Sequence, residues 1–282
     1  AKEIEIESVK FLNLFGFRCR RIKSGRPLKI KVNFRAKEIV CDPHFGVAIF
    51  RDDGVYCYGP NTRFDGYKNI KVKKGKGYFI LNYHKLMLAP GEYRVSVAIW
   101  DNNEVIAYDY HSGYYKLTVS GRDNGLGGFL NIPFRGIPKK ESAFFPVPEV
   151  LEGSWGKRFE SAGLNVESVE LRGRDNKENC VFFTNSAVKL NIKLSGQRVF
   201  DPGLCLFFAI YREDGICCQA VASGIGKDIR IVFPELALLP GGYRISVGIW
   251  DKQQGKFPLL HHGVYPLRMV FDRGDHGTVF LR

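Results

Sequence analysis

The stretch PGEYRVSVAIWD, residues 90–101, recurs as PGGYRISVGIWD at residues 240–251. In the first copy, apolar side chains occupy every second position from Tyr93 to Ile99, and a Pro-Gly turn precedes them. An apolar period of two predicts a β-strand with one buried face. The chain therefore contains the same turn and core strand twice, which indicates a duplicated β domain.

The repeat extends well beyond this line. Matching segments are IESVKFLN at 6–13 with VESVELRG at 166–173, IFRDDG at 49–54 with IYREDG at 210–215, and HSGYYKLTV at 111–119 with HHGVYPLRMV at 261–270. The first two segments lie 160 and 161 residues before their counterparts, whereas the Pro-Gly line and the last segment lie 150 residues before theirs. The second copy therefore lacks 11 residues between its REDG and its PGGYR. A long repeat that occurs only twice favours tandem domains over a solenoid.

Each copy contains short alternating runs separated by turn signals such as KSGRP and HSG. We expect an all-β protein of two tandem immunoglobulin-like antiparallel β-sandwiches, residues 1–120 and 163–282. A Gly-rich and Pro-rich linker, 121–162, should join them. Because a freely flexible linker needs no large aromatic residues, we expect this one to pack partly on the domains. Its aromatic residues are Phe129, Phe134, Phe144, Phe145 and Trp155.

The net charge is +13, and residues 1–120 hold most of it, with 21 Lys and Arg against 12 Asp and Glu. The electrostatic field of this positive charge attracts polyanions, although the same charge is also consistent with a surface that is merely solvated. No apolar run is long enough to span a membrane, and AKEIEIESVK is not a signal peptide. Seven cysteines without a CxxC pair favour a reducing compartment and argue against zinc.

The sequence offers little for catalysis. It lacks the phosphate loop GxxxxGK[ST], GxSxG and HExxH, so we expect no enzyme activity, cofactor or metal in this chain. Asp52–Asp53 and Glu213–Asp214 each precede a glycine between strand-like runs, which favours hairpin turns over acid–base pairs.

The segment GVYCYGPNTRFDG, 54–66, carries the most distinctive binding chemistry. Tyr56 and Tyr58 are expected on one strand face, and Asn61, Thr62 and Arg63 supply amide, hydroxyl and guanidinium groups that suit a hydroxyl-rich or phosphate-bearing ligand. The matching part of copy two, CCQAVASGIGKDIRIV, lacks this set.

Two further residues extend the candidate site. Beyond Ser96 and Ala98, Trp100 would form the aromatic wall of a shallow shelf on which a sugar ring could stack. His111 precedes the final strand and is a weaker candidate. The alternative for Trp100 is packing beneath a loop or a neighbouring domain.

A basic segment, Lys68–Lys76, follows the NTR triplet and contains Lys71, Lys73, Lys74 and Lys76. It allows a different function, in which the chain docks on a protein or an anionic membrane, and such docking would weaken steeply with salt. Nucleic acid is not expected, because no RNA-reading or DNA-reading motif is present.

The combination of FGVAIFRDDGVYCYGPNTR, LAPGEYRVSVAIWD and YDYHSGYYKLTV resembles the C-terminal carbohydrate-binding domain of Wzt, the nucleotide-binding subunit of O-antigen ABC transporters. The likeness covers residues 1–120 well and residues 163–282 less well, because the NTR segment has no counterpart there. It implies an immunoglobulin-like domain at the cytoplasmic face of the inner membrane. The domain would recognise the non-reducing end of a lipid-linked polysaccharide before export, next to the transporter's membrane subunit.

The resemblance has three further implications. The ATPase half is absent from this sequence, and the start at Ala1 suggests that it was cut away rather than that this is a stand-alone tandem variant. Dimerisation is implied, either between two chains or between the two copies as an internal pseudo-dimer. Copy two is expected to be a packing partner, or alternatively to have a site of its own around Trp250 and His261.

Overall fold

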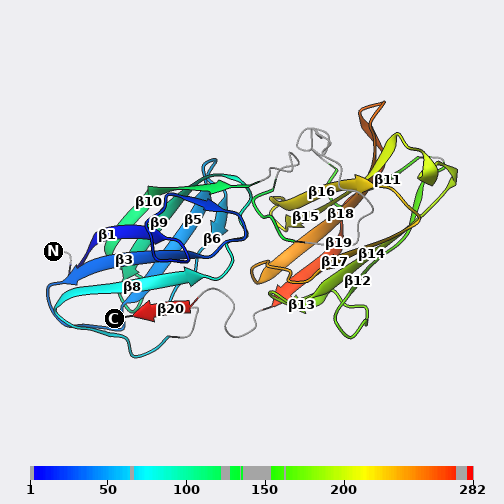
Figure 1. Ribbon diagram of the computed structural model, residues 1–282. Coiled ribbons are helices and arrows are strands. Elements are labelled where there is room, and N and C mark those ends of the chain that lie inside the picture. The colour runs from blue at the N-terminus through cyan, green and yellow to red at the C-terminus, as the bar shows by residue number, and fades with distance from the viewer. Residues whose placement is uncertain are drawn as a thin grey trace. The chain divides into compact units, whose positions relative to one another are not determined.

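The computed structural model describes residues 3–63, 67–121, 128–133, 135, 154–161, 163–270 and 278–281 (Figure 1). The chain divides into two compact units. Unit 1 comprises Ala1–Arg122 with Arg273–Arg282, and unit 2 comprises Asp123–Asp272. Both units are built from β-strands, and a 3-10 turn, η1 (Gln197–Phe200), is the one helical element in the described ranges. The expected all-β class is therefore confirmed.

Unit 1 has two main sheets. The first contains, in spatial order, β1 (Ile4–Leu12), β3 (Leu28–Ala36), β8 (Gly75–Tyr83) and β20 (Thr278–Leu281). The second contains β2 (Arg21–Lys23), β10 (Ala107–Ser120), β9 (Gly91–Trp100), β5 (His44–Arg51) and β6 (Tyr56–Tyr58). A small additional pair is formed by β4 (Val40–Cys41) and β7 (Lys71–Val72).

The core of unit 1 lies between these sheets. The alternation predicted for the repeated line is present, since Tyr93, Val95, Val97 and Ile99 are all buried. Phe45 of the second sheet packs against Phe34 and Phe79 of the first, with ring centroids 5.5 and 4.9 Å apart. The unit is therefore sandwich-like, with apolar faces of two sheets packed together.

Unit 2 repeats this plan. Its first sheet contains β12 (Asn165–Arg172), β14 (Val188–Ser195) and β17 (Asp228–Phe233). Its second sheet contains β11 (Arg158–Glu160), β19 (Lys256–Val270), β18 (Gly241–Asp251), β15 (Leu204–Arg212) and β16 (Cys217–Gly224), with β13 (Val181–Phe183) also paired to β19.

One expectation needs correction, because the sheets are not wholly antiparallel. In unit 1, β2 runs parallel to β10, and in unit 2, β13 runs parallel to β19. In each unit the chain makes a tight turn after the first strand of one sheet and crosses to the other sheet. There it forms a short strand that runs parallel to the long strand β10 or β19. The repeat of this crossover supports duplication of the entire fold.

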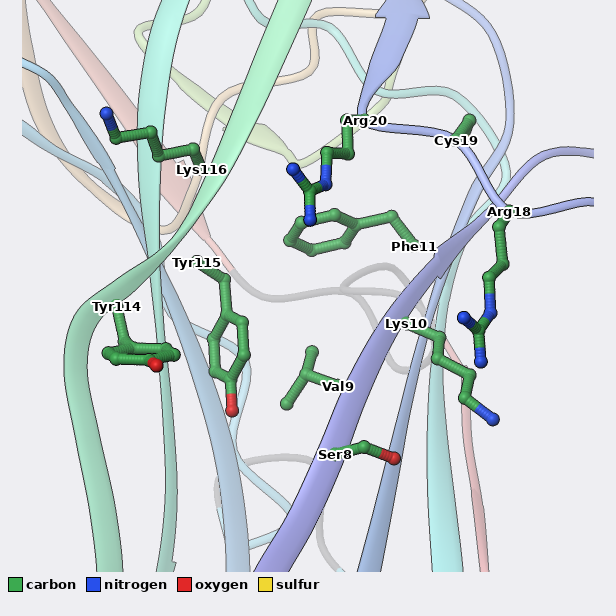
Figure 2. Close-up of a pocket in the computed structure, with 10 residues that line it drawn as sticks. All are labelled: Ser8, Val9, Lys10, Phe11, Arg18, Cys19, Arg20, Tyr114, Tyr115 and Lys116. Carbon is green, nitrogen blue, oxygen red and sulfur yellow. The ribbon is translucent and has the colours of Figure 1, made fainter.

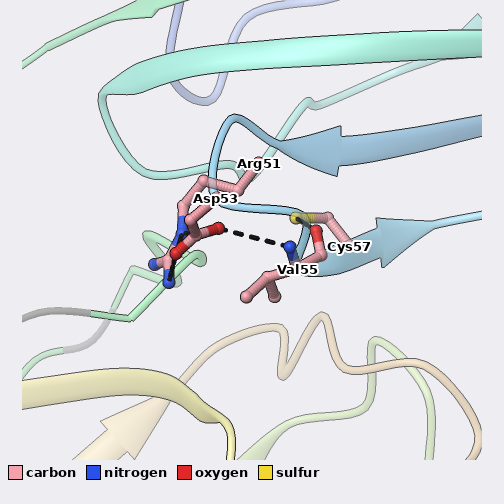
Figure 3. Close-up of polar contacts among 4 residues, drawn as sticks. All are labelled: Arg51, Asp53, Val55 and Cys57. Atoms are coloured by element: carbon pink, nitrogen blue, oxygen red, sulfur yellow. Dashed lines mark hydrogen bonds and ion pairs between the residues drawn. The ribbon is translucent and has the colours of Figure 1, made fainter. Parts of the chain in front are cut away.

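The paired carboxylates lie in hairpin turns, as expected. Asp53 forms an ion pair with Arg51, and its Oδ1 accepts a hydrogen bond from the Val55 N–H at 3.2 Å (Figure 3). The hydrogen bond from Arg51 lowers the pKa of Asp53. Gly54 has φ of 88°, a left-handed conformation that favours glycine. Asp214 repeats these contacts with Arg212 and Ile216 in unit 2, so neither pair is arranged for acid–base work.

The C-terminal segment returns to the first sheet of unit 1. Residues 278–281 form β20, which pairs antiparallel with β8 from Asn82 to Phe79. Arg273–Arg282 therefore group with unit 1, although the repeat had assigned everything after residue 163 to copy two. TVFL has no counterpart in the first copy, so the repeat gave no indication of this pairing.

Part of the segment between the copies packs on unit 2. Phe129, Leu130 and Ile132 are buried, and the N–H and C=O of Ile132 both bond to the side-chain amide of Gln219. Trp155 packs edge-on against His262 at 5.1 Å. The remaining linker aromatics, Phe134, Phe144 and Phe145, lie outside the described residues.

Candidate functional site

The NTR segment forms an irregular edge to β5. Phe45 and Thr62 exchange two hydrogen bonds, in which the Phe45 N–H donates to the Thr62 hydroxyl at 3.0 Å and the Thr62 N–H donates to the Phe45 carbonyl at 3.0 Å. Thr62 is fully buried. The side chain of Thr62 therefore anchors the segment, and its neighbours Asn61 and Arg63 face outward.

Asn61 and Arg63 converge on Glu104, a residue that the sequence had not indicated. The Asn61 amide nitrogen donates to Glu104 Oε1 at 3.0 Å, and Arg63 Nη1 lies 3.1 Å from Glu104 Oε2. Asn61 Oδ1 accepts from the Arg63 N–H at 2.8 Å. We call Asn61, Arg63 and Glu104 the polar cluster. It presents amide, guanidinium and carboxylate groups in one place, which suits vicinal hydroxyls.

Glu104 is held by the turn that follows β9. Asp101 Oδ1 accepts the N–H groups of Val105 and Ile106 at 2.8 and 2.9 Å, and these bonds, with that of Ile106 first, lower the pKa of Asp101. Glu104 itself has φ of 57°. The turn is therefore shaped by its own hydrogen bonds, which hold Glu104 opposite Asn61.

Trp100 lies on the same sheet face and pairs with Tyr110, a second residue that the sequence had not indicated. Their ring centroids are 6.1 Å apart. Gly46 connects this aromatic pair to the polar cluster, because it lies opposite both Asn61 and Ala98. Tyr110 also pairs with Ala98, so the aromatic pair and the polar cluster border one patch of the second sheet.

The open shelf expected beside Trp100 is not formed by small residues. Ser96 and Ala98 are buried, and Ser96 Oγ accepts the Gly113 N–H at 2.7 Å. The reason is a bulge in β10 after His111, which brings Gly113 over β9. Trp100 is half-buried and Tyr110 is exposed, so the aromatic surface comes from this pair and not from a shelf.

The other predicted aromatic and imidazole groups have separate surroundings. Tyr56 packs on Phe50 at 5.4 Å and Tyr58 on Tyr83 at 5.9 Å. His111 lies on β10 with Nδ1 2.6 Å from the Tyr115 hydroxyl. Because β10 alternates its faces, His111 is directed away from the face that carries Tyr110. The structure thus joins Asn61, Arg63 and Trp100 but sets His111 apart.

The predicted lysines Lys71, Lys73, Lys74 and Lys76 are all exposed and lie on or beside β7 and the start of β8. The Ala36–Gly75 pair and the Ile4–Ala36 pair place them at the end of unit 1 where β1 begins. Asp109 accepts the N–H of Ile6 at 2.8 Å, so the start of β10 lies at this end too. The lysines and the patch around Trp100 therefore share one end of the sandwich.

The two candidates in copy two are buried. Trp250 is 5% exposed and packs on Phe257 at 4.8 Å within an apolar cluster on β15, β16, β18 and β19. His261 is 2% exposed, and its Nε2 lies 2.7 Å from Glu160 Oε1. Leu260 stands where copy one has Tyr110, so the aromatic pair is not repeated.

The 11 residues absent from copy two explain this difference. After the hairpin, β16 continues for eight residues along β15, whereas β6 has three residues before the chain departs through the NTR segment. Asn61 and Arg63 thus occupy an edge that a regular strand covers in unit 2. Glu104 and Tyr110 were missed because their roles depend on this edge and on hairpin register, although pairing Trp100 with Tyr110 across the DNNE turn would have indicated one of them.

Three negative findings concern the described residues alone. No group of three His, Cys, Asp or Glu side chains among them could hold a metal ion. None of their helical segments is long and apolar enough to cross a membrane. All seven cysteines lie within the described ranges and are free thiols.

Comparisons with known proteins assign the first half of the chain. Among solved structures, the C-terminal domain of Wzt is 18% identical, with a TM-score of 0.42, and the match covers 46% of this chain and 81% of that one. A CARDB domain from Pyrococcus furiosus, solved with di-metal ions, is 10% identical, with a TM-score of 0.25 over 42% of this chain and 90% of that one. No curated protein matches in a sequence comparison. The model of the Wzt C-terminal domain family matches residues 1–132. The resemblance to the Wzt C-terminal domain family is therefore confirmed for residues 1–132, and the second half of the chain stays unassigned.

Proposed function

We propose that unit 1 is the non-catalytic glycan-recognition region of an O-antigen polysaccharide ABC exporter, acting at the inner face of the inner membrane. It would bind the non-reducing end of a lipid-linked glycan before export, beside the membrane subunit of the transporter. The family match to residues 1–132 supports the class of protein. An immunoglobulin-like character for both units and a dimer or internal pseudo-dimer belong to the same proposal.

The observation that carries the proposal is the meeting of the polar cluster with the aromatic pair Trp100–Tyr110. Sugar rings stack on aromatic faces through C–H groups, while amide, guanidinium and carboxylate groups bond their hydroxyls. Both elements occur in unit 1, and unit 2 has neither at the corresponding positions. A patch of this kind buries little ligand surface, so the expected affinity is weak for a single glycan end.

Tyr56, Tyr58 and His111 remain part of the proposal as flanking residues. Tyr56 is exposed, and its hydroxyl lies directly beneath Gly59, where an added Cβ would stand 1.6 Å from it. A glycan that extends from the polar cluster along β6 would meet Tyr56 next. The buried Thr62 contributes by fixing the segment and not by touching ligand.

The test is binding of the full chain to the host's own polysaccharide and to an unrelated one, at low and high salt. We expect selective binding that tolerates salt, and a loss of roughly tenfold in Arg63→Ala and in Trp100→Ala. Arg174→Ala, which removes an exposed arginine from unit 2, is the matched control. Full binding by both site variants would reject this patch as the glycan site.

The alternative function, docking through the Lys68–Lys76 segment, is supported by the exposure of its lysines. Salt separates the two functions, because attraction between exposed charges is screened within about 10 Å at 0.1 M salt, while stacking and neutral hydrogen bonds are not. Equal, salt-sensitive binding to any polyanion would favour the alternative.

A further inference from the structure

The turn between β1 and β2 presents large apolar side chains to solvent. Leu14, Phe15 and Phe17 are 58, 80 and 69% exposed. Scattered single apolar residues are normal on protein surfaces, but three within four positions of one turn form a patch that marks an interaction site. We call Asn13–Phe17 the apolar turn.

The fold holds these side chains outward. Asn13 Oδ1 accepts the N–H groups of Phe15 and Phe17 at 3.0 Å each, and the Asn13 N–H donates to the Phe17 carbonyl at 2.9 Å. Gly16 adopts φ of 82° at the tip. These bonds fix the backbone of the turn, and in this conformation Phe15 and Phe17 are exposed.

Copy two has the same turn with different chemistry. Gly16 donates to the Asn13 carbonyl at 3.0 Å, and Asn176 donates to the Gly173 carbonyl at 3.1 Å with φ of 62°. The bridges Leu12↔Arg18 and Arg172↔Glu178 also correspond. Yet LFGFR at 14–18 is replaced by RDNKE at 174–178. The shape therefore does not require apolar residues, and their presence in copy one needs another explanation.

Cations flank the apolar turn in the sequence and line a groove next to it. A groove of about 590 Å³ lies between β1 and β10, and the described residues that line it include four cations and no acid. These are Lys10, Arg18, Arg20 and Lys116. Figure 2 shows Arg20, Phe11 and Tyr115 in the space between the two strands, with Lys10 and Arg18 on the other side of β1 in this view.

The same positions in copy two carry the opposite charge or none. Glu170, Glu178, Cys180 and Pro266 replace the four cations. Among the described residues, no ion pair satisfies Lys10, Arg18, Arg20 or Lys116. An apolar tip next to unpaired cations, which we call the four-cation collar, is the pattern of a segment that lies in a membrane interface, with rings at the acyl boundary and cations on anionic headgroups.

We propose that the apolar turn docks unit 1 on an anionic phospholipid bilayer, with Phe15 and Phe17 inserted and the four-cation collar on the headgroup phosphates. The apolar turn follows the end of β1. The Lys68–Lys76 segment and the glycan patch, which is the polar cluster with Trp100 and Tyr110, lie near the beginning of β1, roughly 27 Å away along the strand. One flat bilayer would therefore engage the turn and leave the glycan patch facing away. The inference does not depend on the glycan proposal.

The experiment is co-sedimentation of the full chain with vesicles of phosphatidylcholine, alone or mixed with phosphatidylglycerol. We expect binding to the mixed vesicles and little to phosphatidylcholine alone. The double variant Phe15→Ser with Phe17→Ser should bind at least about tenfold more weakly. Arg18→Ser and Arg20→Ser should each cost roughly fivefold.

Two controls separate the turn from general effects. Phe200→Ser removes a phenylalanine of unit 2 that is 71% exposed, and it should leave vesicle binding unchanged. A graft of RDNKE over residues 14–18 gives copy one the sequence that copy two already folds in this turn, and it should abolish vesicle binding while preserving the thermal unfolding curve. Glycan binding should persist in the graft.

Three results would overturn the proposal. The first is that the unaltered chain binds no anionic vesicles. The second is that the Phe15 and Phe17 double variant binds them as well as the unaltered chain. The third is that the double variant loses self-association on size-exclusion chromatography instead, which would assign the turn to a contact between protein chains.

Discussion

The hydroxyl of Tyr115 lies 2.6 Å from Nδ1 of His111, and unit 2 repeats this pair with Tyr265 2.6 Å from His261. Burial raises the pKa of both tyrosines to about 12, so each keeps its proton at neutral pH. His261 Nε2 faces the Glu160 carboxylate, which can only accept when ionised, so Nδ1 accepts from Tyr265. The duplication thus kept one hydrogen bond in two different environments.

Removing the tyrosine hydroxyl should reduce the free energy of unfolding more in unit 2 than in unit 1. Tyr265→Phe leaves Nδ1 of the buried His261 without its donor, which should destabilise by about 1–3 kcal/mol, whereas Tyr115→Phe beside the partly exposed His111 should cost about 0.5–1.5 kcal/mol. Urea unfolding of both variants measures the difference. Equal losses would show that burial of His261 does not set the cost.

Replacing each of the two tryptophans should reduce the stability of the protein by different amounts. Trp250→Ala opens a cavity in the apolar cluster and should cost about 3–5 kcal/mol. Trp100→Ala removes a half-buried ring and should cost less than about 2 kcal/mol while weakening glycan binding. Thermal unfolding and polysaccharide binding of both variants test this. A stability loss for Trp100→Ala as large as that for Trp250→Ala would show that it is a core residue.

Stability should fall as the solution is acidified below neutrality. Burial lowers the pKa of His262, which lies 2.8 Å from Ser154 Oγ, to about 4 from an ordinary 6.5. Between these values the unfolded chain binds a proton that the folded chain does not, so stability is lost as the pH falls from about 6.5 to 4. The loss should reach roughly 1–3 kcal/mol.

The matched variant is His262→Gln, which cannot titrate. Its urea midpoint should be lower than that of the unaltered chain at pH 7 but should fall less between pH 6.5 and 4. An unchanged slope would assign the pH dependence to the neighbouring His261, whose pKa burial also lowers. Carboxylates such as Asp53 and Asp214 have lowered pKa values and lose their contribution only at still lower pH.

The basic segment offers a control for both proposals. Replacing Lys71, Lys73, Lys74 and Lys76 together by Ser removes four exposed cations without touching the core. We expect glycan binding and vesicle binding each to change less than about fivefold. A complete loss of vesicle binding would mean that the Lys68–Lys76 segment, and not the apolar turn, faces the bilayer.

The sequence predicted the strands well because they depend on local alternation. The period of two around Tyr93–Ile99 and the Asp-Gly turns needs no knowledge of distant residues. The hairpin role of Asp53 could be predicted for the same reason, since its partner Arg51 is two residues away.

Features that depend on distant pairing could not be predicted in this way. Glu104 meets Asn61 through a turn and an edge that are 43 positions apart. The burial of Ser96 follows from a bulge in another strand. The apolar turn had a visible signal in LFGF, but its meaning required exposure values and the polar turn of copy two for comparison.

The return of β20 to β8 has a consequence for biosynthesis. Since the last strand of the first sheet of unit 1 follows all of unit 2 in the sequence, unit 2 is topologically an insertion into unit 1. A ribosome would release a completed unit 2 while β8 still had an unpaired edge. Until residues 278–281 emerge, that edge would be open to other extended chains, and chaperones that shield it would have their greatest effect at this stage.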